Sequence, residues 1–500
     1  MTQSPIRSIV IVGGGTAGWM SAAALAKALG GRIPIRLVES DAIGTVGVGE
    51  STIPMIRRFN QALGIDEADF VRATSATFKL GIEFCDWGRL GERYMHGFGR
   101  FGQDLAALDF YQYWLRMHQA GHEHDLGRYS INQLAAREGR FMPADPSLVN
   151  SPLADLAHAY HIDAGLYARY LRTYAQARGV LRTEGKVVDT FLRGADGHID
   201  SLRLASGELV AGDLFIDCSG FRALLIGQAG RDDWDDWSAW LPCDRAWAVP
   251  CESGAELLPY TRATARAAGW QWRIGLQHRT GNGHVFSSAH MSDDEACAIL
   301  MANLDGAPLA EPRLLRFAAG RRTRAWQRNV VAIGLSTGFL EPLEATSMHM
   351  IQTGIARLLS LFPDLDFCQP EIDEYNRQSA FEAQRIRDFL ILHYHATERS
   401  DTPFWNHCRT MEVPATLTAK MALWRSRGRI VRDADELFAE VGWLQVLHGQ
   451  GVPAGGYHAL ADLLEEHEIA TYLEDVAAVM RQCADVMPRH GDYLGAMLTP

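Results

Sequence analysis

The sequence predicts an α/β fold with inserted antiparallel strands and a mostly helical C-terminal part. An apolar run at residues 8–12 stops in a glycine turn, and an alanine-rich segment at 17–29 then has the composition of a helix. Alternation of apolar and polar residues through 180–217 is typical of strands. A late apolar strand at 329–333 runs into a second glycine turn. These observations predict that the first and the late strand share one sheet.

The first glycine turn has the spacing of a dinucleotide-binding fingerprint. Gly13, Gly15 and Gly18 occupy the positions of G-x-G-x-x-G, where they allow a tight turn, close approach of a pyrophosphate and close packing of helix on strand. The helix that follows directs its N-terminal N–H groups toward the phosphates. We therefore expect Thr16 and Ala17 to contact the cofactor as well.

Two further loops complete the predicted cofactor site. A strand at 33–38 ends in Glu39, about twenty residues after the glycines, where an acid binds a ribose hydroxyl. The loop at 44–54 is too rich in glycine to form core, and we interpret it as backbone laid against a ligand. The remaining residues expected to contact the cofactor are Gly47, Gly49, Glu50 and Ser51 in this loop and Gly334 and Leu335 in the late one.

The order of the other elements favours FAD over NAD. In chain order the sequence predicts helices in 55–77, a strand at 78–84, an aromatic-rich insertion on the substrate side at about 88–157, a helix at 158–178 and an antiparallel meander at about 180–217. Strands at 187–192, 199–204 and 214–217 would form the meander, with turns at Asp196-Gly197 and Ser206-Gly207. This is the order of FAD-binding Rossmann-like oxidoreductases of the glutathione-reductase type.

The chain is expected to have two structural parts. Residues 1–360 would form the FAD-binding core, and residues 361–500 a mainly helical region that caps the substrate. In 371–395 the apolar residues Ile372, Tyr375, Ala383, Ile386 and Leu390 fall on one helical stripe. A second glycine fingerprint for NAD(P)H is not found, so either a separate reductase reduces the flavin or the nicotinamide binds transiently.

Composition narrows the class of protein. The net charge of −12 argues against nucleic acid as a partner. No apolar run reaches the length of a membrane span, and no signal peptide is recognised at the N-terminus. The eight cysteines are scattered without metal-ligand spacing, which predicts a reducing cytoplasm. The basic residues are almost all arginines, and a chain of this kind keeps a lysine where an amine that can lose its proton is useful. The lysines are Lys27, Lys79, Lys186 and Lys420.

Five motifs, taken together, resemble those of the flavin-dependent tryptophan halogenase family. They are Gly-Gly-Gly-Thr-Ala-Gly-Trp at 13–19, Val-Gly-Val-Gly-Glu-Ser-Thr at 46–52, Lys-Leu-Gly-Ile at 79–82, Gly-Trp-Gln-Trp-Arg-Ile at 269–274 and Gly-Phe-Leu-Glu-Pro-Leu-Glu-Ala-Thr-Ser at 338–347. The resemblance covers residues 8 to about 360. It implies an enzyme in which reduced FAD and dioxygen oxidise halide to hypohalous acid, which then reaches an electron-rich aromatic ring.

The resemblance assigns roles to one lysine and one glutamate. Lys79 matches the family's catalytic lysine, which delivers the halogen either as a hydrogen-bonded hypohalous acid or as a haloamine; by itself it could equally be a lysine that snorkels from a strand. Glu344 matches the active-site glutamate, which would stabilise the cationic ring intermediate and accept its proton. Glu341 is the rival for that role, and an acid that caps a helix dipole is the structural alternative.

The same segment is implied to hold the halide. In the family the amides after the glutamate bind it, and these fall here at Thr346 and Ser347. The usual Glu-Ser-Thr-Gly is altered by Ala345 and Ser347, so the choice between bromide and chloride stays open, with bromide favoured.

Two further matches concern the flavin side and the substrate. Trp270 and Trp272 correspond to the paired tryptophans that discourage ordinary monooxygenation, although the following proline is Gly275 here and core packing is the alternative. His96 and Phe98 resemble the family's His-Pro-Phe, which contacts the substrate, with a glycine in place of the proline. The C-terminal third shows no segment for clamping the amino-acid part of tryptophan, so an indole, a phenol or a larger indolic molecule is an equal candidate.

Other interpretations remain open at this point. An FAD-dependent aromatic monooxygenase would hydroxylate instead, and a catalytically silent flavin-binding protein would do neither. His118, His122 and His124 are interpreted as a solvated turn rather than a metal site, and no metal is expected. Cys218 is interpreted as packing beside the cofactor loop. The expected partners are a flavin reductase acting through diffusible reduced FAD, a halide ion and a small aromatic substrate; a homodimer is an open alternative to a monomer.

Overall fold

A computed structural model describes residues 4–43, 49–122, 125–230, 233–254, 256–433 and 435–499. The chain divides into two compact units. The first consists of residues 1–76, 162–239 and 316–384, and the second of residues 77–161, 240–315 and 385–500. Each unit is thus assembled from three separate stretches of the chain.

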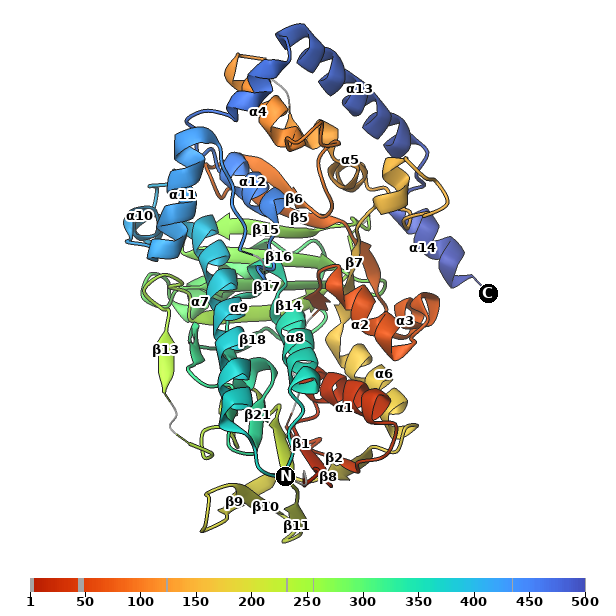
Figure 1. The fold of residues 1–500 in the computed structure, drawn as a ribbon, viewed down its shortest axis with the longest axis vertical. Helices are drawn as coiled ribbons and strands as arrows, with labels where there is room; N and C mark the ends of the chain where they lie inside the picture. Colours follow the sequence, from red (N-terminus) through yellow and green to blue (C-terminus); the bar gives the residue numbers. More distant parts are fainter. Residues whose placement is uncertain are drawn as a thin grey trace. The chain divides into compact units, whose positions relative to one another are not determined.

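The core of the first unit is a six-stranded sheet with the order β20-β21-β12-β1-β2-β8, of which β21, β1, β2 and β8 are labelled in Figure 1. Its strands are β1 (Ile9–Val12), β2 (Ile35–Glu39), β8 (Leu181–Glu184), β12 (Leu214–Asp217), β20 (Trp326–Gln327) and β21 (Val330–Ala332). The strands from β21 to β8 are parallel, and Ile9 lies opposite both Ile35 and Leu214. Every residue of β1 is apolar and buried, as a central parallel strand requires. The predicted return of the late strand to the first sheet is confirmed.

Helices and short strands surround this sheet. The helices of the first unit are α1 (Thr16–Leu29), α2 (Met55–Leu63), α3 (Glu67–Ala73), α6 (Ala164–Gln176) and α8 (Ser347–Ser360), with the start of α9 (Gln369–His395). The 3-10 turns are η3 (Gly220–Arg222), η4 (Gly334–Ser336) and η5 (Pro342–Glu344). The remaining strands are β3 (Gly49–Ser51), β13 (Trp234–Asp236), β19 (Gly320–Arg322) and β22 (Gly338–Phe339). Helix α1 packs against α6 and α8 and ends at Gly30, whose left-handed conformation at φ 58° terminates the helix.

The antiparallel meander differs in part from the prediction. It consists of β9 (Val187–Leu192), β10 (Ile199–Leu204) and β11 (Leu209–Ala211), with turns at the predicted glycines, Gly197 and Gly207. The expectation that residues 214–217 form its third strand is wrong, because β12 lies between β1 and β21 in the parallel sheet. All four residues of β12 are buried. Burial on both faces is typical of a strand in a parallel sheet. The alternation of apolar and polar residues in the strands before β12 led to the expectation of one continuous meander.

The second unit contains a seven-stranded sheet with the order β18-β14-β17-β16-β15-β5-β6. Its strands are β5 (Gly81–Cys85), β6 (Arg93–Gly97), β14 (Arg245–Cys251), β15 (Thr261–Arg266), β16 (Gly269–Gly275), β17 (Thr280–Phe286) and β18 (Arg313–Arg316). Beside it, β4 (Thr77–Lys79) pairs antiparallel with β7 (Ala159–Asp163), so that Thr77 lies opposite His161 and Lys79 opposite Ala159.

The second unit also holds most of the helices after residue 385. Its helices are α4 (Phe110–Gln119), α5 (Ile131–Arg137), α7 (Asp293–Ala302), α10 (Pro403–Thr410), α11 (Ala415–Arg427), α12 (Glu440–Gly449), α13 (Glu466–Asp485) and α14 (His490–Leu498). Short 3-10 turns are η1 (Leu126–Tyr129), η2 (Pro152–Asp155) and η6 (Ala459–Leu463). The predicted apolar stripe of α9 is confirmed, since its members are all buried: Ile372, Tyr375, Ala383, Ile386 and Leu390.

Two predicted elements are divided in the structure. The strand expected at 78–84 breaks at Leu80, because the chain there leaves its pairing with β7 and joins β6 and β15. The helix expected at 158–178 begins only at Ala164, after β7, with Asp163 as the N-cap that accepts a hydrogen bond from the Leu166 amide at 3.0 Å. Both differences arise from strand pairing between distant segments, which local sequence patterns do not contain.

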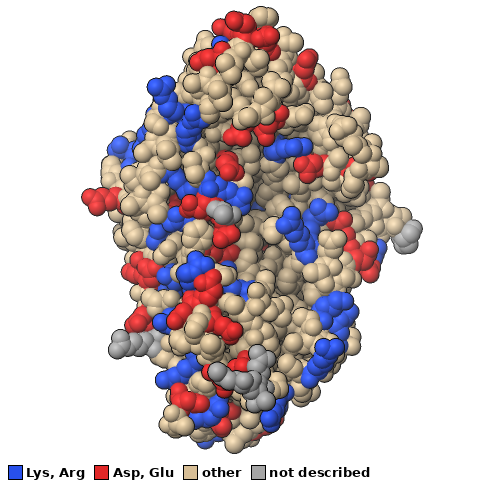
Figure 2. All heavy atoms as spheres, in the orientation of Figure 1, with Lys and Arg blue, Asp and Glu red and all other residues tan. Residues whose placement is uncertain are grey.

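The surface carries charges of both signs. On the face shown in Figure 2, Lys and Arg side chains are interspersed with Asp and Glu side chains rather than gathered into one basic area. Among the helices of the described residues, none is long and apolar enough to cross a membrane.

Candidate active site

The glycine fingerprint forms a tight turn between β1 and α1. Gly13 has φ 112°, and a Cβ atom at this position would lie 2.2 Å from the carbonyl oxygen of Cys218. A Cβ at Gly18 would lie 1.8 Å from the carbonyl oxygen of Gly13. At Gly15, by contrast, a Cβ would meet nothing within 4 Å. Gly13 and Gly18 are therefore required by the fold, whereas Gly15 leaves space beside the backbone.

The start of α1 offers backbone donors to that space. The first helical hydrogen bond runs from the Trp19 amide to the Gly15 carbonyl at 3.1 Å, so the amides of Thr16, Ala17 and Gly18 precede it. Gly15 is the N-cap and contributes no side chain there. Donors at a helix start, next to a position with room for a ligand, fit a pyrophosphate group.

The late glycine loop lies against the same helix start. Gly334 has φ 79°, and a Cβ there would lie 2.8 Å from the Cβ of Ala17. Leu335 follows it in η4. The structure thus brings together two loops that are more than three hundred residues apart in the sequence.

Glu39 also lies at the glycine turn. A Cβ at Gly14 would lie 1.4 Å from its Oε2 atom, so that oxygen faces the turn. Its Oε1 atom accepts a hydrogen bond of 2.5 Å from Nε of Arg182, and Arg172 lies 3.7 Å away. Sequence reasoning missed Arg182, which comes from the edge strand β8 and is brought beside Glu39 only by pairing of β8 with β2.

Part of the second predicted cofactor loop is described. Gly47 lies outside the described residues, whereas Gly49, Glu50 and Ser51 form β3. Glu50 is half-buried. Desolvation, together with the negative charge of Asp163, raises the pKa of Glu50 to about 7. Its carboxyl group therefore retains a proton more readily than that of an ordinary glutamate.

The predicted halide segment is a strained turn ahead of α8. Ala345 has φ 58°, in the left-handed region that non-glycine residues rarely adopt. The next residue, Thr346, is 1% exposed, and its Oγ1 atom is buried with no hydrogen-bond partner among the described residues. The first backbone bond of α8 runs from the Met350 amide to the Thr346 carbonyl, so the Ser347 amide precedes it. A buried hydroxyl and helix-start amides form a plausible cradle for an anion.

Both candidate glutamates are buried in this segment. Glu344 ends η5 and is 2% exposed, and Glu341, the N-cap of η5, is 0% exposed. Burial alone does not show which of the two glutamates takes the active-site role. A buried carboxylate that faces a reacting ring can stabilise positive charge there more strongly than an exposed one.

Lys79, at the end of β4 in the second unit, is 0% exposed. Its Nζ atom lies over the ring of Phe98 at 5.2 Å from the ring centroid, a cation–π geometry. The buried His161 has its pKa well below the usual value, first because of desolvation and then because of the positive charge of Lys79. A lysine that snorkels keeps its amine in water, so complete burial contradicts that alternative.

The backbone that carries Lys79 is held on both sides by histidines. The Phe78 amide donates to Nε2 of His490 at 3.1 Å, and the other ring nitrogen of His490 lies 2.9 Å from the Leu257 carbonyl. Nδ1 of His161 lies 3.1 Å from the hydroxyl of Thr77, which also donates to the Gly275 carbonyl. Sequence reasoning missed both histidines, because neither belongs to a recognisable motif.

His96 lies in an aromatic cluster. It is 8% exposed, and its ring centroid lies 5.7 Å from that of Phe389 and 6.3 Å from that of Phe438. Phe389 and Phe438 stack at 3.8 Å, and Trp443 meets Phe389 edge-on at 5.0 Å. Phe98, the other predicted substrate residue, is half-buried and lies under Lys79. The three additional aromatics were missed because they lie beyond the range of the recognised motifs.

The tryptophan pair is buried in β16. Trp270 is 1% exposed and Trp272 is 7% exposed, with ring centroids 6.1 Å apart. Trp272 lies opposite Gly283 of β17, where a Cβ would lie 2.0 Å from the indole. The missing side chain at Gly283 therefore provides the space that this indole occupies.

The predicted site residues are distributed over both units. The dinucleotide residues, the glutamates and the halide residues belong to the first unit, and Lys79, His96, Phe98 and the tryptophan pair belong to the second.

The sequence also singled out His122 and Cys218. His122 is exposed and pairs with Glu466 at 2.7 Å, while His124 lies outside the described residues. Cys218 is buried 3.8 Å from the Ser21 hydroxyl, and desolvation raises the pKa of its thiol, as packing predicts.

The fold and the first unit's site define a class of protein. A parallel sheet with a glycine fingerprint, an inserted meander and a second glycine loop at the same helix start is the organisation of flavin-binding oxidoreductases.

Known proteins identify the family within this class. The tryptophan halogenase family model matches residues 8–466. The 7-chloro-L-tryptophan 6-halogenase KtzR of Kutzneria sp. (strain 744) is 34% identical, over 98% of this chain and 99% of the relative. A flavin-dependent halogenase structure from Xanthomonas campestris is 47% identical with a TM-score of 0.95, over 99% of this chain and 98% of that one. BrvH, a flavin-dependent halogenase from Brevundimonas sp. BAL3, is also 47% identical with a TM-score of 0.95, over 98% and 99%. The chain belongs to the tryptophan halogenase family and is an enzyme of the flavin-dependent halogenase class.

Proposed function

We propose that this enzyme uses reduced FAD, dioxygen and bromide or chloride to halogenate an electron-rich, indole-like aromatic substrate, and that Lys79 delivers the halogen. The observation that carries the proposal is the complete burial of Lys79 over Phe98 in a chain that uses arginine for nearly all its other basic positions. Family membership supports the reaction type.

The first unit would hold the FAD. The amides at the start of α1 would bind the pyrophosphate, Glu39 a ribose hydroxyl, and the loops at Gly49–Ser51 and Gly334–Leu335 the remainder of the cofactor. When bound and reduced, FAD supplies with dioxygen the two-electron oxidation that turns halide into hypohalous acid. A separate flavin reductase would supply the reduced form, since we find no second nucleotide fingerprint in the sequence.

The halide would lie at the start of α8. The Thr346 hydroxyl, buried and without a partner among the described residues, and the Ser347 amide are the donors for it. Ala345 and Ser347 replace the family's serine and glycine, and we propose that the resulting pocket prefers bromide to chloride.

Lys79 and Glu344 would carry out the transfer. As an ammonium ion, Lys79 donates a hydrogen bond to the oxygen of hypohalous acid and polarises the oxygen–halogen bond; as a neutral amine it would form a haloamine. The negative face of the Phe98 ring attracts an ammonium ion at this position. Glu344 would stabilise the cationic ring that forms on attack and then accept its proton.

His96 and Phe98 would contact the substrate ring. Phe389, 0% exposed, packs against both His96 and Trp443, and contact with the substrate through aromatic faces alone does not require the charged groups of an amino acid. We therefore propose an indole or a larger indolic molecule as substrate.

The proposal is tested by supplying the enzyme with FAD, a flavin reductase, NADH, air, bromide and a panel of indoles and phenols. Mass spectrometry should show the bromine isotope doublet, and the product should depend on the reductase. A product that gains only oxygen would identify a monooxygenase. Absence of product with every substrate would favour a silent flavin-binding protein.

Variants locate the chemistry within the same assay. Lys79→Ala should abolish the halogenated product while peroxide release from reduced flavin continues, and the control Lys186→Ala, at an exposed lysine, should match the wild type. Thr346→Val removes the buried hydroxyl without changing the side-chain shape, so it should raise the bromide concentration needed for half-maximal rate. Retained halogenation in Lys79→Ala would refute the role of this lysine.

A further inference from the structure

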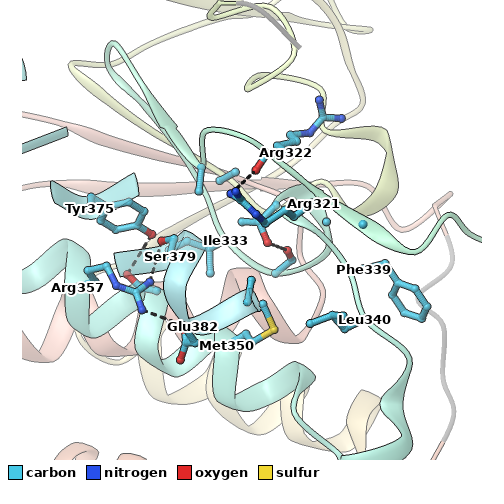
Figure 3. Close-up of a pocket in the computed structure, with 18 of the residues that line it drawn as sticks. Arg321, Arg322, Ile333, Phe339, Leu340, Met350, Arg357, Tyr375, Ser379 and Glu382 are labelled. Carbon is cyan, nitrogen blue, oxygen red and sulfur yellow. Dashed lines mark hydrogen bonds and ion pairs between the residues drawn. The ribbon is translucent and has the colours of Figure 1, made fainter. Parts of the chain in front are cut away.

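One carboxylate in the first unit binds three residues of α8. Glu382, on α9, lies 3.3 Å through Oε1 from Nε2 of His349. Its Oε2 atom accepts hydrogen bonds of 2.9 Å from Oγ1 of Thr353 and 2.9 Å from the Arg357 guanidinium. Arg357 also donates to the Ser379 hydroxyl at 2.9 Å (Figure 3). The carboxylate thus joins two helices that run side by side.

The spacing of these three residues places all of them on the side of α8 that faces Glu382. His349, Thr353 and Arg357 are four residues apart and therefore lie on one face of the helix. His349 is 6% exposed. Desolvation would raise the pKa of Glu382, but the hydrogen bond from His349 and the charge of Arg357 outweigh it, and the pKa lies below its usual value. Glu382 is consequently a buried carboxylate that stays ionised through its contacts with Arg357 and the other two side chains.

His349 has a particular place in this contact. It is in the first turn of α8, two residues after Ser347, and its own amide precedes the first helical hydrogen bond. Thr353 and Arg357 bind Glu382 one and two turns further along. Of the three side chains, that of His349 is the one that belongs to the turn whose amides are the donors of the proposed halide site.

The same region adjoins the late glycine loop. A small cavity of about 40 Å³ is lined by Gly334, Leu340, Met350, Arg357 and Glu382, among others (Figure 3). A Cβ at Gly334 would also lie 3.5 Å from Ile351 of α8. The late glycine loop thus faces Ile351, in the second turn of α8, whereas the proposed halide donors lie at the start of the first turn.

We infer that His349 and Glu382 are positioning residues for halide: they hold the first turn of α8 where its amides and the Thr346 hydroxyl converge on the ion. This inference rests on the proposed halide site. The imidazole would touch neither halide nor flavin; it acts through the backbone that it restrains. The choice between chloride and bromide would depend on this positioning, because halide donors displaced by a fraction of an ångström bind a smaller or larger ion differently.

The test compares two substitutions that remove hydrogen bonds to the same carboxylate. His349→Leu releases the first turn, whereas the matched control Thr353→Val releases the second. His349→Leu should raise the half-saturating bromide concentration about tenfold, the order of magnitude of one hydrogen bond to a charged group, with the aromatic substrate KM unchanged. Thr353→Val should leave it near the wild-type value. His349→Gln, which retains an N–H near the Nε2 position, should restore most of the affinity.

A direct readout accompanies the kinetics. Crystals of the wild type and each variant, soaked in a series of bromide concentrations, should show anomalous scattering at Thr346 and Ser347, with lower occupancy in His349→Leu. FAD affinity, measured by fluorescence quenching, should be unchanged. If His349→Leu does not fold, His349→Met, which is unbranched and cannot donate a hydrogen bond to Glu382, replaces it.

The outcomes separate this inference from the proposed function. Equal effects of His349→Leu and Thr353→Val, or no effect of either, would overturn it while halogenation by the wild type still stands. Bromide bound in the crystal without halogenation by the wild type would contradict the proposed function, and the variant occupancies would still decide the positioning role. Absence of bromide at Thr346 and Ser347 in the wild type would overturn the site and the inference with it.

Discussion

At the scale of single residues, Gly13 and Gly15 of the same motif differ in what the absence of a side chain provides. Gly13 combines a positive φ with a carbonyl oxygen where its Cβ would lie, so both backbone conformation and space demand glycine. Gly15 has an ordinary extended conformation, with φ −75° and ψ −171°, and empty space around it. The first glycine therefore serves the fold, and the second is available to serve a ligand.

This distinction predicts that alanine substitutions at the two glycines affect different properties, stability in one case and FAD binding in the other. Gly13→Ala should lower the free energy of unfolding by more than about 2 kcal/mol, from strain in φ and the clash with Cys218. Gly15→Ala should leave stability unchanged but weaken FAD binding, because its methyl group would enter the space proposed for the pyrophosphate. Thermal unfolding and a flavin fluorescence titration measure the two quantities. Equal stability of the two variants would contradict the assignment.

At the scale of elements, the β16–β17 pair shows how a strand makes room for a functional side chain. The register places Gly283 directly opposite Trp272, and the indole covers the glycine. The large indole of one strand fills the space left by the glycine of the other strand. A change in the size of either residue therefore affects the packing of its partner. The buried tryptophan pair is therefore positioned by its neighbouring strand as well as by its own.

A double-mutant cycle should measure this constraint. Gly283→Ala alone should destabilise the protein by about 1–3 kcal/mol through overpacking against the indole. Combined with Trp272→Phe, whose smaller ring leaves space, it should cost clearly less than the sum of the single changes. Urea unfolding of the four proteins gives the coupling energy, and strict additivity would show that the two side chains do not share this space.

At the scale of the molecule, the second unit depends on buried neutral histidines. His284 and His490 are both 0% exposed, and desolvation, partly opposed by a backbone hydrogen bond, lowers the pKa of each to about 4. The unfolded chain binds protons at these residues near pH 6.5, whereas the folded protein resists protonation until about pH 4. Their contribution to stability is thus complete above pH 6.5 and is lost progressively as the pH falls toward 4.

The pH dependence of stability should therefore become shallower when one of these histidines is replaced. His490→Gln retains an acceptor for the Phe78 amide but cannot be protonated. Between pH 6.5 and 4 the slope of unfolding free energy against pH should decrease by about 1.4 kcal/mol per unit relative to the wild type. The control His467→Gln, at an exposed histidine, should retain the wild-type slope. A parallel wild-type and His490→Gln profile would exclude this titration as the cause.

The sequence by itself determined the local parts of this protein. The glycine fingerprint, the strand that precedes it, the turns at Gly197 and Gly207 and the apolar stripe of α9 follow from spacing and residue type, which short-range geometry obeys. Five motifs taken together, those around Lys79 and Glu344 among them, predicted the family, which the comparisons confirm.

Only the tertiary structure decided which distant residues meet. The place of β12 in the parallel sheet, the division of the strand at Leu80, the contact of Arg182 with Glu39, and the helix-to-helix contact of Glu382 with His349 depend on pairing and packing over long sequence separations. A local sequence pattern indicates which face of an element is buried, but it does not indicate which other element packs against that face. That partner is chosen by the whole chain as it buries its apolar surface and satisfies its polar groups together.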